Sequence, residues 1–228
     1  MNSIAKTQHV EVRTLKIIRK ALLICGILSS LLYVGTDILA AMQWEDYSYT
    51  SQAVSELQAV GAPTRSLVVL LFTIYGVLVI AFGLGILLTD SRKRARFMGI
   101  LLIGYGIVGQ VVLLFFPMHL RGDEETISDI MHATLTGVTV LFILLYIGLG
   151  ATLHGKRFRL YSIGTILVLI LFGVLAGLDG PRVAAQLPTP WLGITERINI
   201  FSAMLWVLVL AIILLRVENG RVSIKADA

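Results

Sequence analysis

Long apolar stretches alternate with short polar segments along the chain, and such a stretch occurs six times. A helix needs about 20 mostly apolar residues to cross the hydrocarbon core of a bilayer. The first stretch is too long for the apolar region of a cleaved signal peptide, so we count it as a span. The pattern therefore predicts an all-α integral membrane bundle of six transmembrane helices. The predicted spans are Ile17–Met42, Ser66–Thr89, Phe97–Pro117, Asp129–Leu153, Phe158–Leu178 and Pro190–Leu215.

The connection between the first two predicted spans, residues 43–65, carries a helical pattern of its own. Its apolar residues recur at helical spacing at Ala53, Val54, Leu57 and Val60. Thr50 or Ser51 could cap the start of this segment, and Gly61 with Pro63 would end it. We expect a short amphipathic helix that lies on the outer surface or dips into it. Such a helix either presents polar side chains at a site or only covers the end of the bundle.

Composition supports the membrane assignment. Of the 228 residues, 57% are hydrophobic and 14% are charged, and the mean hydropathy is +0.86. A soluble domain carries about 25% charged residues, so this chain has too little polar surface for a water-soluble globule of its size. We expect a single domain over residues 1–228, with cytoplasmic tails at about residues 1–16 and 217–228.

The net charge of +5 would suggest a nucleic-acid partner if the basic residues were spread evenly, but they are sorted. Of the 19 Lys and Arg residues, 15 lie at the two ends of the chain (as far as Lys20 and from Arg216) and in the segments 90–96 and 154–159, which share one side of a six-span topology. The positive-inside rule places that side in the cytoplasm. We therefore expect a multi-pass protein of the cell (cytoplasmic) membrane with both termini cytoplasmic, membrane lipids as partners and no nucleic-acid partner.

The acidic residues show the opposite distribution, because ten of the 14 lie in outer connections or at the outer ends of spans. Topology does not require this, since acidic residues influence orientation little. Asp37 is the strongest single signal, because it lies about one turn inside the outer end of the first span, where an isolated charge is costly. It shares a helical face with Tyr33, Ser30 and Ser29, which should point into the bundle. Asp37 either forms a structural ion pair with an outer arginine or belongs to a functional site.

The second outer connection brings a carboxylate and imidazoles together in the sequence. Asp129 and His132 are three residues apart and share a helical face that Thr136 continues. This pair could bind a metal with His119 as a third ligand, or it could form an acid–base pair. Thr126-x-x-Asp129 also fits a capping box at the start of the fourth span, which would explain the carboxylate without any site.

The third outer connection leads into the last span with further charges. Thr189 followed by Pro190 is typical of a helix start, with a cap and then proline at the first helical position. Glu196 and Arg197 would lie about two turns into that span. Because adjacent residues point in different directions, we expect each to pair with another helix rather than with its neighbour. The alternatives are a buried ion-pair network and direct contact with a substrate.

Small and amide residues inside the spans indicate helix packing. Gly173-x-x-x-Gly177 and glycines such as Gly99 and Gly109 are typical of closely packed membrane helices. Gln110 lies near the middle of the third span, where an interhelical hydrogen bond is the simplest explanation. These residues are not expected to form a site.

Several motifs of the outer side form a recognisable set. They are Ser51–Arg65, Phe116–Gly122, Thr126, Asp129-x-x-His132 and Glu196-Arg197. This set resembles the motifs of an uncharacterised family of polytopic membrane proteins catalogued as domain of unknown function 998. Gln58 departs from the resemblance, because a glycine is expected there. The resemblance implies the six-span fold and a bacterial or archaeal cytoplasmic membrane, but it brings no established activity.

The sequence lacks the signatures of several classes of membrane enzyme, and its candidate functional residues are the polar residues of the outer side. The chain lacks the His-x-x-x-His pair of alkaline ceramidases, the Ser-Gly-His of lipid phosphatases and the Gly-x-Ser-Gly of rhomboid proteases. We favour binding or movement of a polar small molecule or lipid headgroup at the outer side over catalysis. The alternatives are an outward-facing enzyme that uses Asp129 and His132, with His119 and a metal as an option, and a non-catalytic scaffold or sensor. No other cofactor is expected, and the oligomeric state is left open. The candidate site comprises Asp37, Ser55, Glu56, Arg65, His119, Arg121, Asp129, His132, Asp179, Arg182, Glu196 and Arg197.

Overall fold

The computed structural model describes residues 2–226, with side chains described for residues 13–220. Within that part of the chain, six helices are long and apolar enough to cross a membrane, which confirms the predicted all-α fold with six spans. The elements are α1 (Asn2–Gln43), the 3-10 helix η1 (Val54–Gln58), α2 (Arg65–Thr89), α3 (Lys93–Phe115), α4 (Ile127–Gly150), α5 (Gly155–Leu178), the short α6 (Gly180–Ala184) and α7 (Leu192–Ala226).

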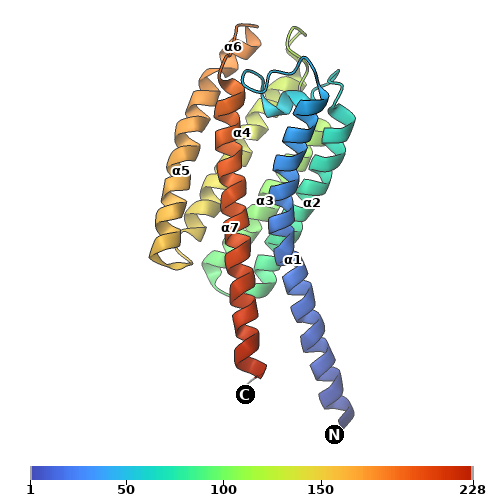
Figure 1. Cartoon of the computed structure of the whole chain (residues 1–228), viewed down its shortest axis with the longest axis vertical. Helices are drawn as coiled ribbons and strands as arrows, with labels where there is room; N and C mark the ends of the chain where they lie inside the picture. Colours follow the sequence, from blue (N-terminus) through green and yellow to red (C-terminus); the bar gives the residue numbers. More distant parts are fainter. Residues whose placement is uncertain (1, 227–228) are drawn as a thin grey trace.

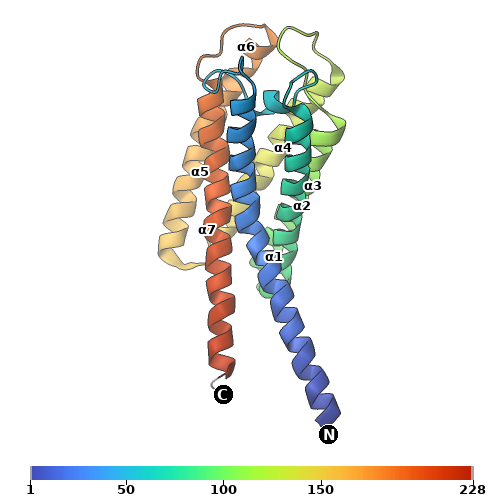
Figure 2. The same cartoon turned by 45° about the vertical axis from the view of Figure 1, so that its right-hand side comes forward.

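The six long helices form a ring (Figures 1 and 2). Each of α1, α2 and α3 packs against the next helix in the chain, and α7 returns to pack between α5 and α1. The ring closes between α4 and α5, and this seam is the most weakly packed of the six among the described residues. The first and last spans are therefore neighbours, although they are farthest apart in the sequence.

Both ends of the chain lie at one end of the bundle, and α1 and α7 extend there beyond the other helices (Figure 1). The predicted tails, residues 1–16 and 217–228, continue these two helices as far as residues 2 and 226. Predictions on the tail side chains before residue 13 and after residue 220 fall outside the described side chains. The opposite end carries the connections 44–64, 116–126 and 179–191, and we call it the mouth end. Its placement outside the cytoplasm stays a prediction.

Glycines set the distance between some helices but not others. A Cβ added to Gly83 of α2 would lie 2.8 Å from the carbonyl oxygen of Gly99 on α3, so the close approach of these helices requires glycine. Gly99 thus has the predicted packing role. Gly109 and Gly177 do not, because an added Cβ would meet no heavy atom within 4 Å at either position. These two glycines face open space instead of a neighbouring helix.

Of the two helix caps predicted at the mouth end, the one at the start of α4 is confirmed and the one at the start of α7 is wrong. Thr126 caps α4, and its side chain exchanges hydrogen bonds with Asp129 in the predicted capping box. Thr189 does not cap α7, which begins at Leu192. The Thr189 hydroxyl instead donates to the Ser51 carbonyl oxygen at 3.0 Å, because the first connection packs against the third.

The helix in the first connection is present, but it is shorter than the sequence pattern predicted. It is a single 3-10 segment, η1, that starts after Ala53 and not at Thr50 or Ser51. Val54, Glu56 and Leu57 are all buried, so η1 inserts into the bundle rather than lying on its surface. The carbonyl oxygens of Gln52 and Ala53, just before η1, accept hydrogen bonds from the Tyr47 hydroxyl.

Candidate functional site

A buried ion pair joins the first and last spans at the mouth end. Asp37 of α1 is 0% exposed and Arg197 of α7 is 3% exposed. The Arg197 Nη2 and Nε atoms donate to the two carboxylate oxygens of Asp37 at 2.9 and 3.0 Å. A bidentate pair of this kind is among the stronger hydrogen-bonded arrangements in proteins. The expectation that Asp37 pairs with an outer arginine therefore agrees with the structure.

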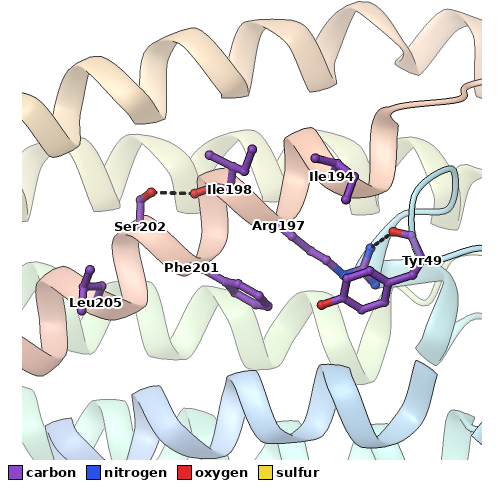
Figure 3. A pocket seen from close by; sticks show the side chains of 7 residues that line it. All are labelled: Tyr49, Ile194, Arg197, Ile198, Phe201, Ser202 and Leu205. Carbon is purple, nitrogen blue, oxygen red and sulfur yellow. Dashed lines mark hydrogen bonds between the residues drawn. The ribbon is translucent and has the colours of Figure 1, made fainter. Parts of the chain in front are cut away.

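The remaining Arg197 donors are all used by the first connection and by α7 itself. Nη1 donates to the carbonyl oxygens of Tyr49, Gln52 and Gly193, and Nη2 donates to the Tyr47 hydroxyl at 2.7 Å. The guanidinium carbon also lies 3.6 Å from the centre of the Tyr49 ring (Figure 3). This stacking adds a cation–π attraction to the hydrogen bonds. Arg197 thus has no donor left for a ligand.

Two tyrosines of the first connection complete this ion-pair network. Tyr49 donates to Asp37 Oδ2 at 2.9 Å, and Tyr47 donates to the backbone of residues 52 and 53. Burial raises the pKa of the Tyr47 hydroxyl, and burial together with the Asp37 hydrogen bond raises the pKa of Tyr49. Both phenols therefore stay protonated and keep their donor roles.

A second ion pair links η1 to the second connection. Glu56 is 1% exposed and accepts from Arg121 Nη2 at 2.7 Å and from Arg121 Nε at 3.0 Å. The backbone N–H of Ala53 and the Gln52 side chain fill the remaining acceptor sites of Glu56. Arg121 Nη1 donates a hydrogen bond to the Thr189 hydroxyl oxygen at 2.7 Å. The pair therefore connects all three mouth connections, and Thr189 is a member that the sequence did not identify.

Glu196 points away from its neighbour Arg197, as the helix geometry predicted. Its Oε2 accepts from the backbone N–H of Val54 at 2.7 Å, which holds the start of η1 against α7. No described residue donates to the other carboxylate oxygen. Glu196 also lines the cavity described below, whereas Arg197 does not.

Asp129 and His132 do not form a pair with each other. Asp129 accepts from Thr126 and from the His119 backbone N–H, and its Oδ2 lies 3.0 Å from His119 Nδ1. His132 Nδ1 instead donates to the Phe116 carbonyl oxygen at 2.8 Å. Among the described residues, no group of three His, Cys, Asp or Glu side chains is placed to hold a metal ion. The geometry therefore gives the metal hypothesis, with its ligands His119, Asp129 and His132, no support.

Three further candidates lie apart from both ion pairs. Arg182 is half exposed, approaches Asp179 at 3.7 Å and donates to the Pro188 carbonyl oxygen. Arg65 donates to the Gln58 carbonyl oxygen at 2.5 Å and has no described carboxylate partner. These side chains hold local turns together and do not join a common site.

A cavity of about 620 Å³ lies in the mouth half of the ring, and every long helix contributes to its wall. The predicted face of α4 is confirmed as part of this wall, because Asp129, His132 and Thr136 all line it. Half of the predicted site residues line the cavity and the other half do not. The lining candidates are Ser55, His119, Arg121, Asp129, His132 and Glu196, and the others are Asp37, Glu56, Arg65, Asp179, Arg182 and Arg197.

Several polar groups of the cavity have no hydrogen-bond partner among the described residues. His132 is 8% exposed. Because its Nδ1–H donates a hydrogen bond to the Phe116 carbonyl oxygen, the Nε2 atom of the neutral ring carries a free lone pair. Gln58 also lines the cavity, and its buried Oε1 has no hydrogen-bond partner. Buried polar groups are normally satisfied by protein or water, so unpaired ones around an open volume indicate a place for a ligand or water.

The deeper part of the wall is aromatic. The Tyr75 and Tyr105 hydroxyls share a hydrogen bond of 2.8 Å, and the Tyr33 ring stacks on Phe72 at 4.5 Å. Gln110 donates to the Phe72 carbonyl oxygen, so its expected interhelical hydrogen bond is present. The sequence missed these tyrosines as cavity residues, because mid-span aromatic residues more often serve only packing. Polar hydroxyls on three neighbouring spans were the signal that could have found them.

A second, shallower pocket of about 420 Å³ runs along α7 (Figure 3). Its wall consists mainly of Ile194, Ile198, Phe201 and Leu205. Arg197 is its one charged member, and the donors of Arg197 are occupied as described above. This pocket therefore offers apolar surface but no free polar group, and the cavity inside the ring is the better candidate for a site.

The six apolar helices define the chain as a polytopic membrane protein. More particularly, it belongs to the family described as protein of unknown function (DUF998), whose model matches residues 27–213, a range that includes the whole or part of each span. This confirms the resemblance noted in the sequence motifs. Comparison with curated proteins and with solved structures found no match.

Proposed function

We propose that the protein binds or moves a polar small molecule or lipid headgroup, and that the cavity inside the ring is the binding site. The observation that carries this proposal is the set of unpaired polar groups, above all His132 Nε2, around a volume of about 620 Å³. Ligand pockets commonly have a few hundred to 1,000 Å³ with largely apolar walls and a few placed polar groups. The cavity fits that description.

The free groups of the cavity indicate which head chemistry fits. His132 Nε2 and Gln58 Oε1 are both acceptors. Arg121 and Arg197, the arginines of the two ion pairs, are already bound to carboxylates, and this argues against recognition of a phosphate or carboxylate group by either of them. The ligand head is therefore a hydrogen-bond donor, such as a hydroxyl or ammonium group.

A cavity-filling variant tests the proposal directly. Gly109 lines the cavity, and Gly109→Leu would place its side chain in open space. Native mass spectrometry of the purified protein should show a copurifying molecule on the wild type and its loss in Gly109→Leu. Gly148→Leu is the control, because Gly148 also faces open space but does not line the cavity. A copurifying molecule that persists in Gly109→Leu, or that never appears on the wild type, would contradict the proposal and favour a scaffold.

The second candidate function is that of a membrane enzyme, and one observation favours it. The hydrogen bond to Phe116 fixes the His132 ring so that Nε2 faces the cavity, as a general base requires. The sequence suggested a pair of His132 with Asp129, but in the structure the backbone carbonyl of Phe116, and not Asp129, orients the imidazole. If the copurifying molecule is converted to a product by the wild type and not by His132→Leu, the protein is an enzyme; binding without turnover rejects this candidate.

A further inference from the structure

The wall of the cavity is incomplete between α4 and α5. These helices follow each other in the chain, are joined by the short turn 151–154, and separate toward the mouth end (Figures 1 and 2). They also make the weakest contact of the six seams in the described ring. Residues from both helices nevertheless line the same cavity. The cavity therefore extends into this seam.

The α5 residues that line the cavity carry no side chain larger than a methyl group. They are Gly173, Ala176 and Gly177, and Gly180 at the start of α6 lines the cavity as well. Small residues in membrane helices usually allow another helix to approach closely. Here Gly177 and Gly180, and Gly137 across the seam on α4, have no heavy atom within 4 Å of the place where a Cβ would stand. The space that these residues leave is therefore not filled by the protein.

The surroundings of the seam indicate what fills this space. Both helices belong to the membrane-spanning segments, so hydrocarbon surrounds the seam. The seam is continuous with the cavity, where His132 is more than nine-tenths buried with a free Nε2. An occupant that satisfies both parts has an apolar chain for the seam and a hydrogen-bonding head for the cavity.

We propose that the occupant is a membrane lipid that enters sideways through the α4–α5 seam, with an acyl chain in the seam and its head beside His132 and Glu196. This inference rests on the proposed binding function and names its ligand class. A free polar molecule entering from the aqueous side would need no opening of this kind. The small residues of α5 then serve lipid passage instead of helix packing.

Photolabelling tests the inference on the unmodified protein. The full chain is placed in nanodiscs that contain phosphatidylglycerol with a photoactivatable diazirine on one acyl chain, and labelled residues are mapped by peptide mass spectrometry. Labels are expected on the cavity-lining residues of α4, such as Thr136, Gly137 and Val140, and on those of α5, namely Gly173, Ala176 and Gly177. Labels confined to outward-facing residues such as Leu141 and Leu171, which are 55% and 57% exposed, would overturn the inference.

A matched pair of variants separates this inference from the binding proposal. Gly137→Leu with Gly177→Leu fills the seam, and Gly148→Leu with Gly164→Leu changes the same two helices at open positions outside the cavity. Cavity labelling should be lost in the first variant and kept in the second. If the seam variant keeps its label while Gly109→Leu loses the copurifying molecule, binding stands and sideways entry fails. If the seam variant keeps its label and Gly109→Leu keeps the copurifying molecule, both proposals fail together.

Discussion

The two sides of the mouth end use similar residues with opposite results. On the side of α1 and α7, Asp37 and Arg197 are buried, and the guanidinium donors all have partners. Around the cavity, His132 of α4 and Gln58 of η1 each keep an acceptor atom without a hydrogen-bond partner among the described residues. The comparison teaches that charge alone does not mark a site in this protein. The completed network supports the fold, and the incomplete wall is available for a ligand.

Arg197→Met should cause the largest fall in the free energy of unfolding, because it disrupts the Asp37–Arg197 network. It leaves the buried Asp37 carboxylate without its guanidinium, and loss of one partner of a buried pair costs about 3–5 kcal/mol. The free energy of unfolding in mixed micelles measures this. The control is Arg182→Met, because the Arg182 side chain is 48% exposed and lies 3.7 Å from Asp179, and such exposed pairs contribute about 0–1 kcal/mol. Equal losses in both variants would contradict the distinction between the two pairs.

Glu56→Gln should have the next largest effect. It keeps the shape of the side chain but removes the charge that Arg121 contacts with two donors, and hydrogen bonds to charged groups contribute about 1.5–3 kcal/mol. The loss should be smaller than for Arg197→Met, because the Arg121 side chain is 24% exposed and water can solvate it. Unfolding under the same conditions gives the ranking, and a larger loss than in Arg197→Met would reverse it.

His132→Leu should separate stability from binding on the open side. It removes one hydrogen bond, that to Phe116, so the free energy of unfolding should fall by only about 1 kcal/mol. The copurifying molecule should nevertheless be lost, because Nε2 is the free acceptor at the cavity. Thr134→Ala on the exposed face of the same helix is the control, and it should keep the molecule. Retention in both variants would remove His132 from the site.

Gly109→Leu should have the smallest effect on stability and a positive one. Leucine is better than glycine in a helix interior by up to about 1 kcal/mol, and the added side chain meets open space. The measurement is the free energy of unfolding after delipidation, so that a lost ligand does not enter the comparison. A destabilisation of about 1–3 kcal/mol, typical of overpacking, would show that this part of the ring has no room.

Much of the fold could be predicted from the sequence, because hydropathy alone sets the membrane spans. The α4 cap was predicted as well, since a capping box depends on residues three apart, Thr126 and Asp129. The partner of Asp37 could not be chosen, because four outer arginines were available and the actual one lies 160 residues away. Tertiary contacts decided that choice.

The sequence predicted which polar residues gather at the mouth end, but it did not predict how they are arranged there. The sequence placed the polar residues at one end of the bundle, yet it could not show that Ser55, His132 and Glu196 line a cavity while Asp37 and Arg197 do not. Gly177 illustrates the reason. Its spacing from Gly173 is the same whether a helix or an open space faces it, and only the course of the α4–α5 seam decides between them.

The Asp37–Arg197 pair also has a consequence for the order in which the chain is made. Synthesis delivers Asp37 to the membrane before α7 exists, and an unpaired carboxylate within a span is costly, by about 2.5–3.5 kcal/mol at the span centre on insertion scales and by less near its end. The first span therefore gains its full stability in the membrane only when the last span is in place. A chain that stops before α7 lacks Arg197 and keeps Asp37 without its guanidinium partner.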